Sequence, residues 1–286
     1  MLLSLKNLTL LSMSFNKLTL LPKTSSNATP QKFDIVGLAS CNLTKFPDFL
    51  QNQNRLIPQL FWKTSTKTLT FLDLSHNFLT SFNQTHAALP WSSLLILNIS
   101  SNRFQGSLPI PPPLISFYSI SINEFSREIP SLICKLNFGT AEPDMLLSLK
   151  NLTLLSMSFN KLTLLPKTSS NATPQKFDIV GLASCNLTKF PDFLQNQNRL
   201  IPQLFWKTST KTLTFLDLSH NFLTSFNQTH AALPWSSLLI LNISSNRFQG
   251  SLPIPPPLIS FYSISINEFS REIPSLICKL NLSNNN

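Results

Sequence analysis

The chain has 286 residues, a formal net charge of +10, 42% hydrophobic residues and only five glycines. It contains no glycine-rich phosphate loop and no G-x-S-x-G or H-E-x-x-H motif, so we expect no enzyme, no cofactor and no metal site. Its lysines are scattered about one per loop, without the basic and aromatic cluster that a phosphate backbone needs, so we expect no nucleic-acid partner. No apolar run reaches the roughly 18 residues that span a bilayer.

The sequence is a duplication. Residues 1–137 recur unchanged as residues 145–281, and residues 138–144 form the junction between the two copies. Residues 282–286 read as the start of a truncated further repeat. Each copy is built from about five shorter units with the pattern LxxLxLxxNxL. Such units cannot bury their leucines alone and need stacked neighbours, so the nested repetition predicts a solenoid.

Taken in chain order, each unit centres on one anchor residue. The first unit has Leu8, Leu11 and Met13 before the asparagine at position 16 and Leu18 after it. The anchors of the first copy are Asn16, Cys41, Asn77, Asn102 and Asn123, and those of the second are Asn160, Cys185, Asn221, Asn246 and Asn267. The alternation of apolar and outward residues predicts a short parallel strand before every anchor.

The anchors are expected to satisfy buried backbone groups. An asparagine side chain has two donors and an acceptor, so stacked asparagines can bond the turns of neighbouring units where water is excluded. Cysteine tolerates this position because it is small and usually buried, although it bonds weakly. The four cysteines are far apart in the stacked array, and we expect free buried thiols at Cys41, Cys134, Cys185 and Cys278.

The unit over residues 94–109, LLILNISSNRFQGSLP, carries the fuller pattern LxxLxLxxNxFxGxLP. It resembles the plant extracellular leucine-rich repeat, and the likeness extends to plant receptor-like proteins of the disease-resistance type. The resemblance covers nearly all of both copies. It implies an α/β leucine-rich-repeat solenoid, a curved stack of short parallel strands with loops and short 3-10 or α turns on the convex side. It also implies a protein or peptide ligand, a receptor-kinase co-receptor and a full-length parent on the extracellular side of the plasma membrane.

The spacing of the anchors departs from the family pattern. Successive anchors in the first copy are 25, 36, 25 and 21 residues apart, and 37 residues separate Asn123 from Asn160. The usual repeat is about 20 to 29 residues, so the 36-residue interval indicates a missing strand, and the 37-residue interval is too long for one unit and short for two. Lost coding segments or a mis-joined gene model would explain this. The start at Met1 reads as repeat sequence rather than as a signal peptide, and we expect neither export signal nor anchor in the chain as written.

Sequons favour secretion, although accidental sequons in a polar chain remain the alternative. The candidate N-glycosylation sites are Asn7, Asn27, Asn42, Asn83, Asn98, Asn151, Asn171, Asn186, Asn227, Asn242 and Asn281.

Ligand binding is expected on the outward strand residues, six, four, two and one positions before each anchor, which parallel strands stack into one concave face. The candidates are Phe15, Phe71, Asp73, Ser75, His76, Ser100, Phe117, Ser119, Phe159, Phe215, Asp217, His220 and Phe261. Phenylalanines among serines are typical of an adaptable protein-binding face, but they could equally pack against one another. Asp73 and His76 share one unit, yet without a third partner we interpret them as surface residues rather than an acid–base pair.

Three functions remain open. The first is ligand recognition within a plant receptor-like protein, in defence signalling through partner receptor kinases. The second is a truncated duplicated remnant without independent activity, which the identity of the two copies favours. The third is a soluble leucine-rich-repeat inhibitor of microbial enzymes. Without polar end units to shield the core we expect the chain to be poorly soluble when expressed alone.

Overall fold

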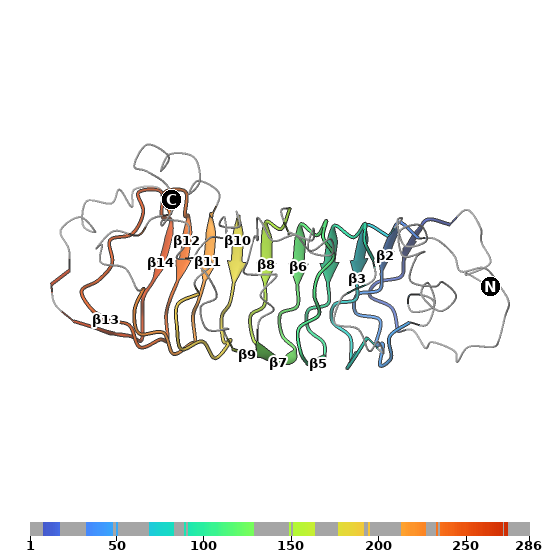
Figure 1. Cartoon of the computed structure of the whole chain (residues 1–286), viewed down its shortest axis with the longest axis horizontal. Helices are drawn as coiled ribbons and strands as arrows, with labels where there is room; N and C mark the ends of the chain where they lie inside the picture. Colours follow the sequence, from blue (N-terminus) through green and yellow to red (C-terminus); the bar gives the residue numbers. More distant parts are fainter. Residues whose placement is uncertain are drawn as a thin grey trace, which may run out of the picture.

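The computed structural model is a stack of short parallel strands that runs along the longest axis of the molecule (Figure 1). It describes residues 8–17, 33–47, 50, 69–82, 89, 91–128, 149, 151–163, 177–191, 194, 213–226, 233, 235–270 and 272–273. The junction at 138–144 and residues 282–286 lie outside the described residues.

One parallel sheet of ten strands forms the backbone of the stack. In spatial order its strands are β1 (Leu10–Ser12), β2 (Ile35–Gly37), β3 (Phe71–Asp73), β4 (Ile96–Asn98), β6 (Phe117–Ser119), β8 (Leu154–Ser156), β10 (Ile179–Gly181), β11 (Phe215–Asp217), β12 (Ile240–Asn242) and β14 (Phe261–Ser263). Each strand lies directly before one of the ten anchors. The expected leucine-rich-repeat solenoid is therefore confirmed.

The strands follow from the alternation of inward and outward residues. The central residue of each strand points into the stack, as Leu72 and Leu97 do, and both are fully buried. Pairing is in register along the whole sheet, so Leu72 lies opposite Val36 on one side and Leu97 on the other. A slip by one residue would place these side chains in water, which fixes the register.

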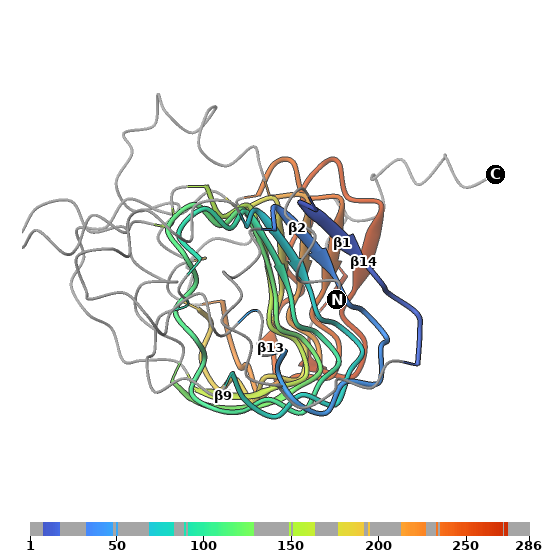
Figure 2. The same ribbon diagram turned by 90° about the vertical axis from the view of Figure 1, so that its right-hand side faces the viewer.

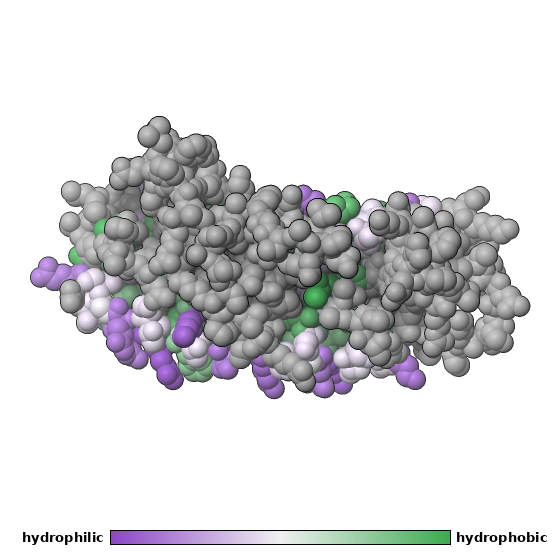
Figure 3. Space-filling model, viewed as in Figure 1, coloured by the Kyte–Doolittle hydropathy of each residue, from purple (hydrophilic) through white to green (hydrophobic). Residues whose placement is uncertain are grey.

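Short second strands follow several anchors, on a different side of the coil (Figures 1 and 2). Strands β5 (Gln105–Gly106), β7 (Glu124–Glu128) and β9 (Lys161–Thr163) form one small sheet, and β13 (Gln249–Gly250) pairs with β15 (Glu268–Phe269). Helical turns were expected on the convex side. Among the described residues helix occurs only at Leu50 and Leu194. At the short strands the alternation continues past the anchor and buries Phe104 while Gln105 stays exposed, and hydrophilic side chains line this edge of the molecule (Figure 3).

The two copies join without a break in the sheet. Strand β6, the last main-sheet strand of the first copy, pairs in parallel with β8, the first of the second copy, with Tyr118 opposite Leu155. Likewise β2 pairs directly with β3 across the 36-residue interval between their anchors. In the described part of the chain neither long interval adds a strand to the main sheet.

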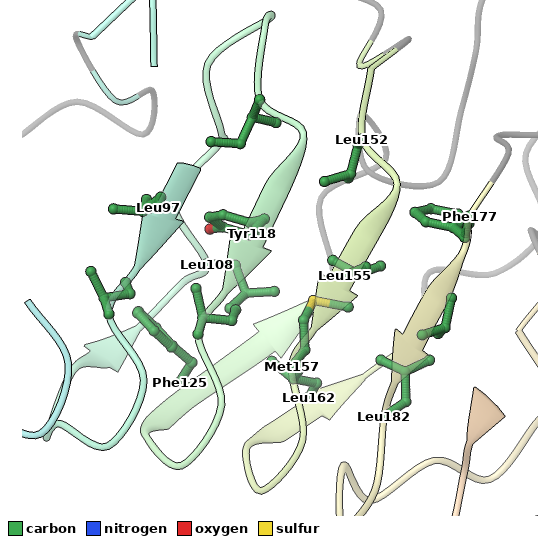
Figure 4. Close-up of a cluster of buried hydrophobic side chains, with 14 of the residues drawn as sticks. Leu97, Leu108, Tyr118, Phe125, Leu152, Leu155, Met157, Leu162, Phe177 and Leu182 are labelled. Carbon is green, nitrogen blue, oxygen red and sulfur yellow. The ribbon is translucent and has the colours of Figure 1, made fainter. Parts of the chain in front are cut away.

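The core is one continuous apolar column. Figure 4 shows Tyr118 and Phe125 from the first copy pointing into the same interior as Leu155, Met157 and Leu162 from the second. Away from the main sheet, ring contacts extend the column: the centroids of Phe82 and Phe104 are 4.5 Å apart and those of Phe104 and Phe125 5.8 Å apart. Aromatic stacking of this kind adds to the free energy of burial.

Candidate functional site

The outward residues of the ten main strands form one surface, which we call the strand face: the positions six, four, two and one before each anchor. Pairing in register turns each of these positions into a row that crosses all ten strands. Residues of one chemical kind fill the row six positions before the anchors, whereas the row directly before the anchors is mixed.

The row six positions before the anchors is apolar throughout. It consists of Leu10, Ile35, Phe71, Ile96, Phe117, Leu154, Ile179, Phe215, Ile240 and Phe261. All ten side chains are half-buried or exposed, and Phe261 is 50% exposed. A contiguous apolar stripe that is partly open to solvent on every strand is typical of an interaction surface.

The next two rows are small and polar, and local hydrogen bonds hold their longer side chains. The Asp73 carboxylate accepts the N–H of Ser75 at 2.9 Å. Asn98 Oδ1 accepts the N–H of Ser100 at 3.2 Å and its hydroxyl at 2.7 Å. These bonds aim the carboxylate and the amide along their own strands. The polar rows therefore form a shallow floor beside the apolar stripe.

The row directly before the anchors has a left-handed backbone in all ten units. Its residues are Phe15, Ser40, His76, Ser101, Ile122, Phe159, Ser184, His220, Ser245 and Ile266, with φ between 50° and 62°. This conformation is costly for large side chains and most costly for β-branched ones. Ile122 nevertheless adopts it and is 53% exposed. The turn into the anchor thus presents a bulky residue to solvent at a strained position.

The anchors hold this turn in place from beneath. The amide nitrogen of Asn77 donates to the carbonyls of Leu38, Leu74 and Ser75 at 2.8 to 3.0 Å, and its oxygen accepts the N–H groups of Cys41 and Leu43. One side chain therefore bonds its own unit and the preceding unit. Asn102, Asn123, Asn160, Asn221, Asn246 and Asn267 repeat this pattern, each with donors to both units and at least one accepted N–H.

The candidate ligand-binding residues do not share one environment. Phe15 and Phe159 are exposed at 81% and 52%, and both histidines are exposed. Half-buried candidates are Phe71, Asp73, Ser100, Phe117, Phe215 and Asp217. Ser75 and Ser119 differ from the expectation of an open surface: they are 3% and 8% exposed, because strands on both sides flank their short side chains. The two serines are therefore part of the polar floor and are not exposed for contact with a ligand.

The phenylalanines of the strand face do not stack on one another in the described part of the chain, where the ring contacts belong to the interior. Nor does any group of three or more His, Cys, Asp or Glu side chains in the described ranges have a geometry that could hold a metal ion. No described helix is long and apolar enough to cross a membrane.

The cysteines and sequons that can be placed occupy distinct positions. Cys41 and Cys185 are buried free thiols. Burial raises the pKa of the Cys185 thiol to about 12, against a smaller lowering by backbone hydrogen bonds around Asn160 and Phe159. Five sequon asparagines are described: Asn42, Asn151 and Asn186 are exposed, whereas Asn98 and Asn242 are half-buried on the strand face. Cys134, Cys278, Asn7, Asn27, Asn83, Asn171, Asn227 and Asn281 lie outside the described residues.

The sequence analysis did not predict the strained backbone at Ile122. Nor did it predict that this exposed isoleucine has an exposed phenylalanine as its neighbour where the two copies meet. Its neighbour across the β6–β8 pair is Phe159 at the same position of the next unit, also about half exposed. The signal was present in the sequence as a β-branched residue directly before an anchor asparagine, where serine and histidine are better tolerated.

Sequence comparison finds plant receptor-like proteins among the relatives of this chain. No protein-family model matches the chain. Receptor-like protein 54 of Arabidopsis thaliana is 29% identical over 284 aligned residues, which cover 87% of this chain and 35% of that protein. Further receptor-like proteins of the same plant are 30% to 35% identical over shorter stretches. The chain thus spans about a third or less of the length of these curated relatives.

One of the two solved structures described next, a bacterial one, supports the fold. A leucine-rich-repeat protein of Leptospira interrogans superposes with a TM-score of 0.53 at 17% identity, over 87% of this chain and 64% of that one. The Arabidopsis receptor kinase HAESA, solved with the peptide hormone IDA and the co-receptor SERK1, matches with a TM-score of 0.48 at 21% identity, over 98% of this chain and 49% of that one. The chain is a leucine-rich-repeat solenoid, and its curated homologues are Arabidopsis receptor-like proteins.

Proposed function

We propose that this chain is part of the ligand-recognition region of a plant receptor-like protein, and that it binds a protein or peptide on the strand face. The observation that carries the proposal is the apolar row that crosses all ten main strands in register beside a polar floor. An apolar core with a polar border is the usual composition of a protein-binding surface.

The dimensions of the strand face favour an extended ligand over a small molecule. Adjacent strands lie about 4.8 Å apart, so ten strands span roughly 43 Å. An extended peptide rises about 3.3 Å per residue, so about 13 residues would follow the whole apolar row. A small-molecule site is instead a concave pocket that buries most of its ligand. The proposed ligand therefore presents several apolar side chains along its length.

The proposed setting is defence signalling on the extracellular side of the plasma membrane, in a parent protein that acts through partner receptor kinases. Two features support this setting: the likeness to Arabidopsis receptor-like proteins and the sequons, of which Asn42, Asn151 and Asn186 are exposed. The complex recorded for HAESA concerns that receptor alone. The exact identity of the two copies favours one competing function, a duplicated remnant without ligand.

The test is selection of peptides from a phage-displayed library of random 12-residue sequences against the purified 286-residue chain. We expect selected peptides rich in apolar residues, with binding that falls at least tenfold in Phe117→Asp, which corresponds to about 1.4 kcal/mol. The matched control is Leu114→Asp, because Leu114 is exposed but lies outside the strand face. If no peptide is selected, or if Phe117→Asp and Leu114→Asp weaken binding equally, the strand face is not the binding surface and the remnant is the better description.

A further inference from the structure

The strand face contains the same three-strand arrangement twice, once in each copy. Strand β3 lies between β2 and β4, and β11 lies between β10 and β12, with matching partners at every position. The local geometry repeats as well: Asp73 and Asp217 each accept the N–H of the serine two residues later at 2.9 Å. All six strands lie inside the sheet, with a described strand on both sides. The chain therefore has two equivalent surfaces, each complete within the described sheet.

The two surfaces are far enough apart to act separately. Strands β3 and β11 are five strand-to-strand steps apart in the sheet (Figure 1). At about 4.8 Å per step, their centres are about 24 Å apart. The four strands between them, β4, β6, β8 and β10, carry no charged residue on the strand face. An extended peptide of seven residues spans about 23 Å, so one such segment fits on each surface.

Each surface has one charge at its centre. Asp73 and Asp217 are the only Asp, Glu, Lys or Arg residues on the strand face, in a chain with a net charge of +10. Both are half-buried. In the described part of the chain, the one hydrogen bond of each carboxylate is the bond to its own serine N–H. An ionised carboxylate accepts up to about four hydrogen bonds, so each keeps capacity for a cationic donor.

The neighbours of the carboxylate leave room for such a donor. Gly37 lies opposite Asp73 on β2 and has no side chain. On the other side the amide oxygen of Asn98 is already used by the N–H and hydroxyl of Ser100. Phe71, two residues before Asp73, belongs to the apolar row and is half-buried. A lysine or arginine could therefore bring its charge to Asp73 while its hydrocarbon stem packs on the apolar row.

We propose that the strand face holds two equivalent binding sites for a peptide segment with one basic residue among apolar ones, centred on Asp73 and on Asp217. The inference rests on the proposed function and adds to it the charge of the ligand and the number of segments bound. The net charge of the chain does not oppose it, because exposed charges more than about 10 Å away are largely screened at physiological salt. Charge complementarity at the contact selects a basic segment over an acidic one.

The test begins with phage-displayed random seven-residue peptides selected against the purified 286-residue chain. Selected peptides with one lysine or arginine are synthesised, and calorimetric titration measures how many bind per chain. D73N and D217N each remove one charge and keep an acceptor for the serine N–H, as Asn98 does in the next unit. The matched control is D34N, because Asp34 is also half-buried but lies seven positions before its anchor, outside the strand face.

Thermal unfolding checks that each variant is folded. Where an asparagine variant is not, D73S or D217S replaces it, since serine occupies the same row at Ser119 and Ser156.

We expect the wild type and D34N to bind two peptides per chain with one dissociation constant. D73N and D217N should each keep one site at that constant and weaken the other at least tenfold, and D73N/D217N should weaken both at least tenfold. The inference is overturned, with the proposed function intact, if the selected peptides lack basic residues, if the wild type binds one peptide, or if D73N/D217N binds like D34N. Selection of twelve-residue peptides but of no seven-residue peptide also overturns it. If neither library yields a peptide, the proposed function fails and this inference fails with it.

Discussion

The asparagine anchors and the cysteine anchors occupy equivalent positions in their units but make different numbers of hydrogen bonds. Asn77 makes five hydrogen bonds that join its own unit to the preceding one. Cys41 is as deeply buried, yet its thiol donates only toward Met13 O at 3.0 Å and Ala39 O at 3.4 Å. The backbone N–H groups of Asn160 and Phe159 approach the sulfur of Cys185 and lower the pKa of the thiol, whereas the amide oxygen of Asn77 accepts two backbone N–H groups at 2.9 and 3.0 Å.

The difference shows which of the anchor's hydrogen bonds can be weakened without loss of the fold. Cysteine keeps the donor that reaches the carbonyl of the preceding unit, as Cys185 does toward Met157 O at 3.1 Å. Its sulfur is a weaker acceptor than an amide oxygen. The asparagine of the following unit compensates, because Asn77 accepts the N–H of Cys41 as well as that of Leu43. A weak anchor is therefore tolerated when a full anchor follows it in the stack.

The largest expected effect comes from removing a full anchor. Asn77→Ala leaves two buried N–H groups and up to three buried carbonyls without their partner, and we expect it to lower the free energy of unfolding by about 3 kcal/mol. Asn16→Ala is the matched control, because Asn16 is exposed and bonds only its own unit; we expect a loss of about 0.5 kcal/mol there. Urea unfolding followed by circular dichroism measures both. Equal losses at the two positions would show that the bonds between units carry no stability.

This contrast also shows how far the sequence could predict the fold. The positions of the ten strands and the bonding role of Asn77 follow from a local pattern, since period-two alternation and a buried amide have few structural solutions. The burial of Ser75 and Ser119 could not be read from that pattern, because it depends on the strands that flank them in space. The short strands β5 and β7 were not predicted, because they depend on pairing between units past the anchor, which one unit does not encode.

The sequence predicted which residues of each strand point outward, but not which of them are neighbours across strands. The outward positions were assigned from the anchors alone, and the apolar row became visible once the register placed Phe71 beside Ile35 and Ile96. The left-handed backbone before every anchor was not predicted. It arises from the turn that the anchor amide holds, so isoleucine at position 122 adopts a conformation that its own preference opposes.

A second experiment converts a weak anchor into a full one. In Cys185→Asn the new amide can donate to Met157 O and Ala183 O, the two carbonyls that the thiol now approaches at 3.1 and 3.5 Å. Its oxygen would replace the weak sulfur acceptor at the position where the asparagine units bind the preceding turn. We expect the free energy of unfolding to rise by about 1 kcal/mol. Cys185→Ala, which removes the donor without adding an acceptor, should lower it. If Cys185→Asn is destabilised as much as Cys185→Ala, the cavity rather than the weak acceptor selects cysteine.

The smallest expected effect concerns the ionisation of the same thiol. Burial raises the pKa of Cys185 in the folded chain from 9.0 to about 12, so the unfolded chain releases this proton at lower pH than the folded chain does. The contribution of the neutral thiol to stability is complete below pH 9 and is lost progressively as the pH rises from 9 towards 12. Between pH 9 and pH 9.5 the loss should be about 0.5 kcal/mol. The same titration of Cys185→Ser lacks this group, so subtracting its urea-unfolding profile isolates the thiol. If the two profiles are parallel over this interval, the sulfur is hydrated in the folded chain and is not the closed apolar anchor that its burial indicates.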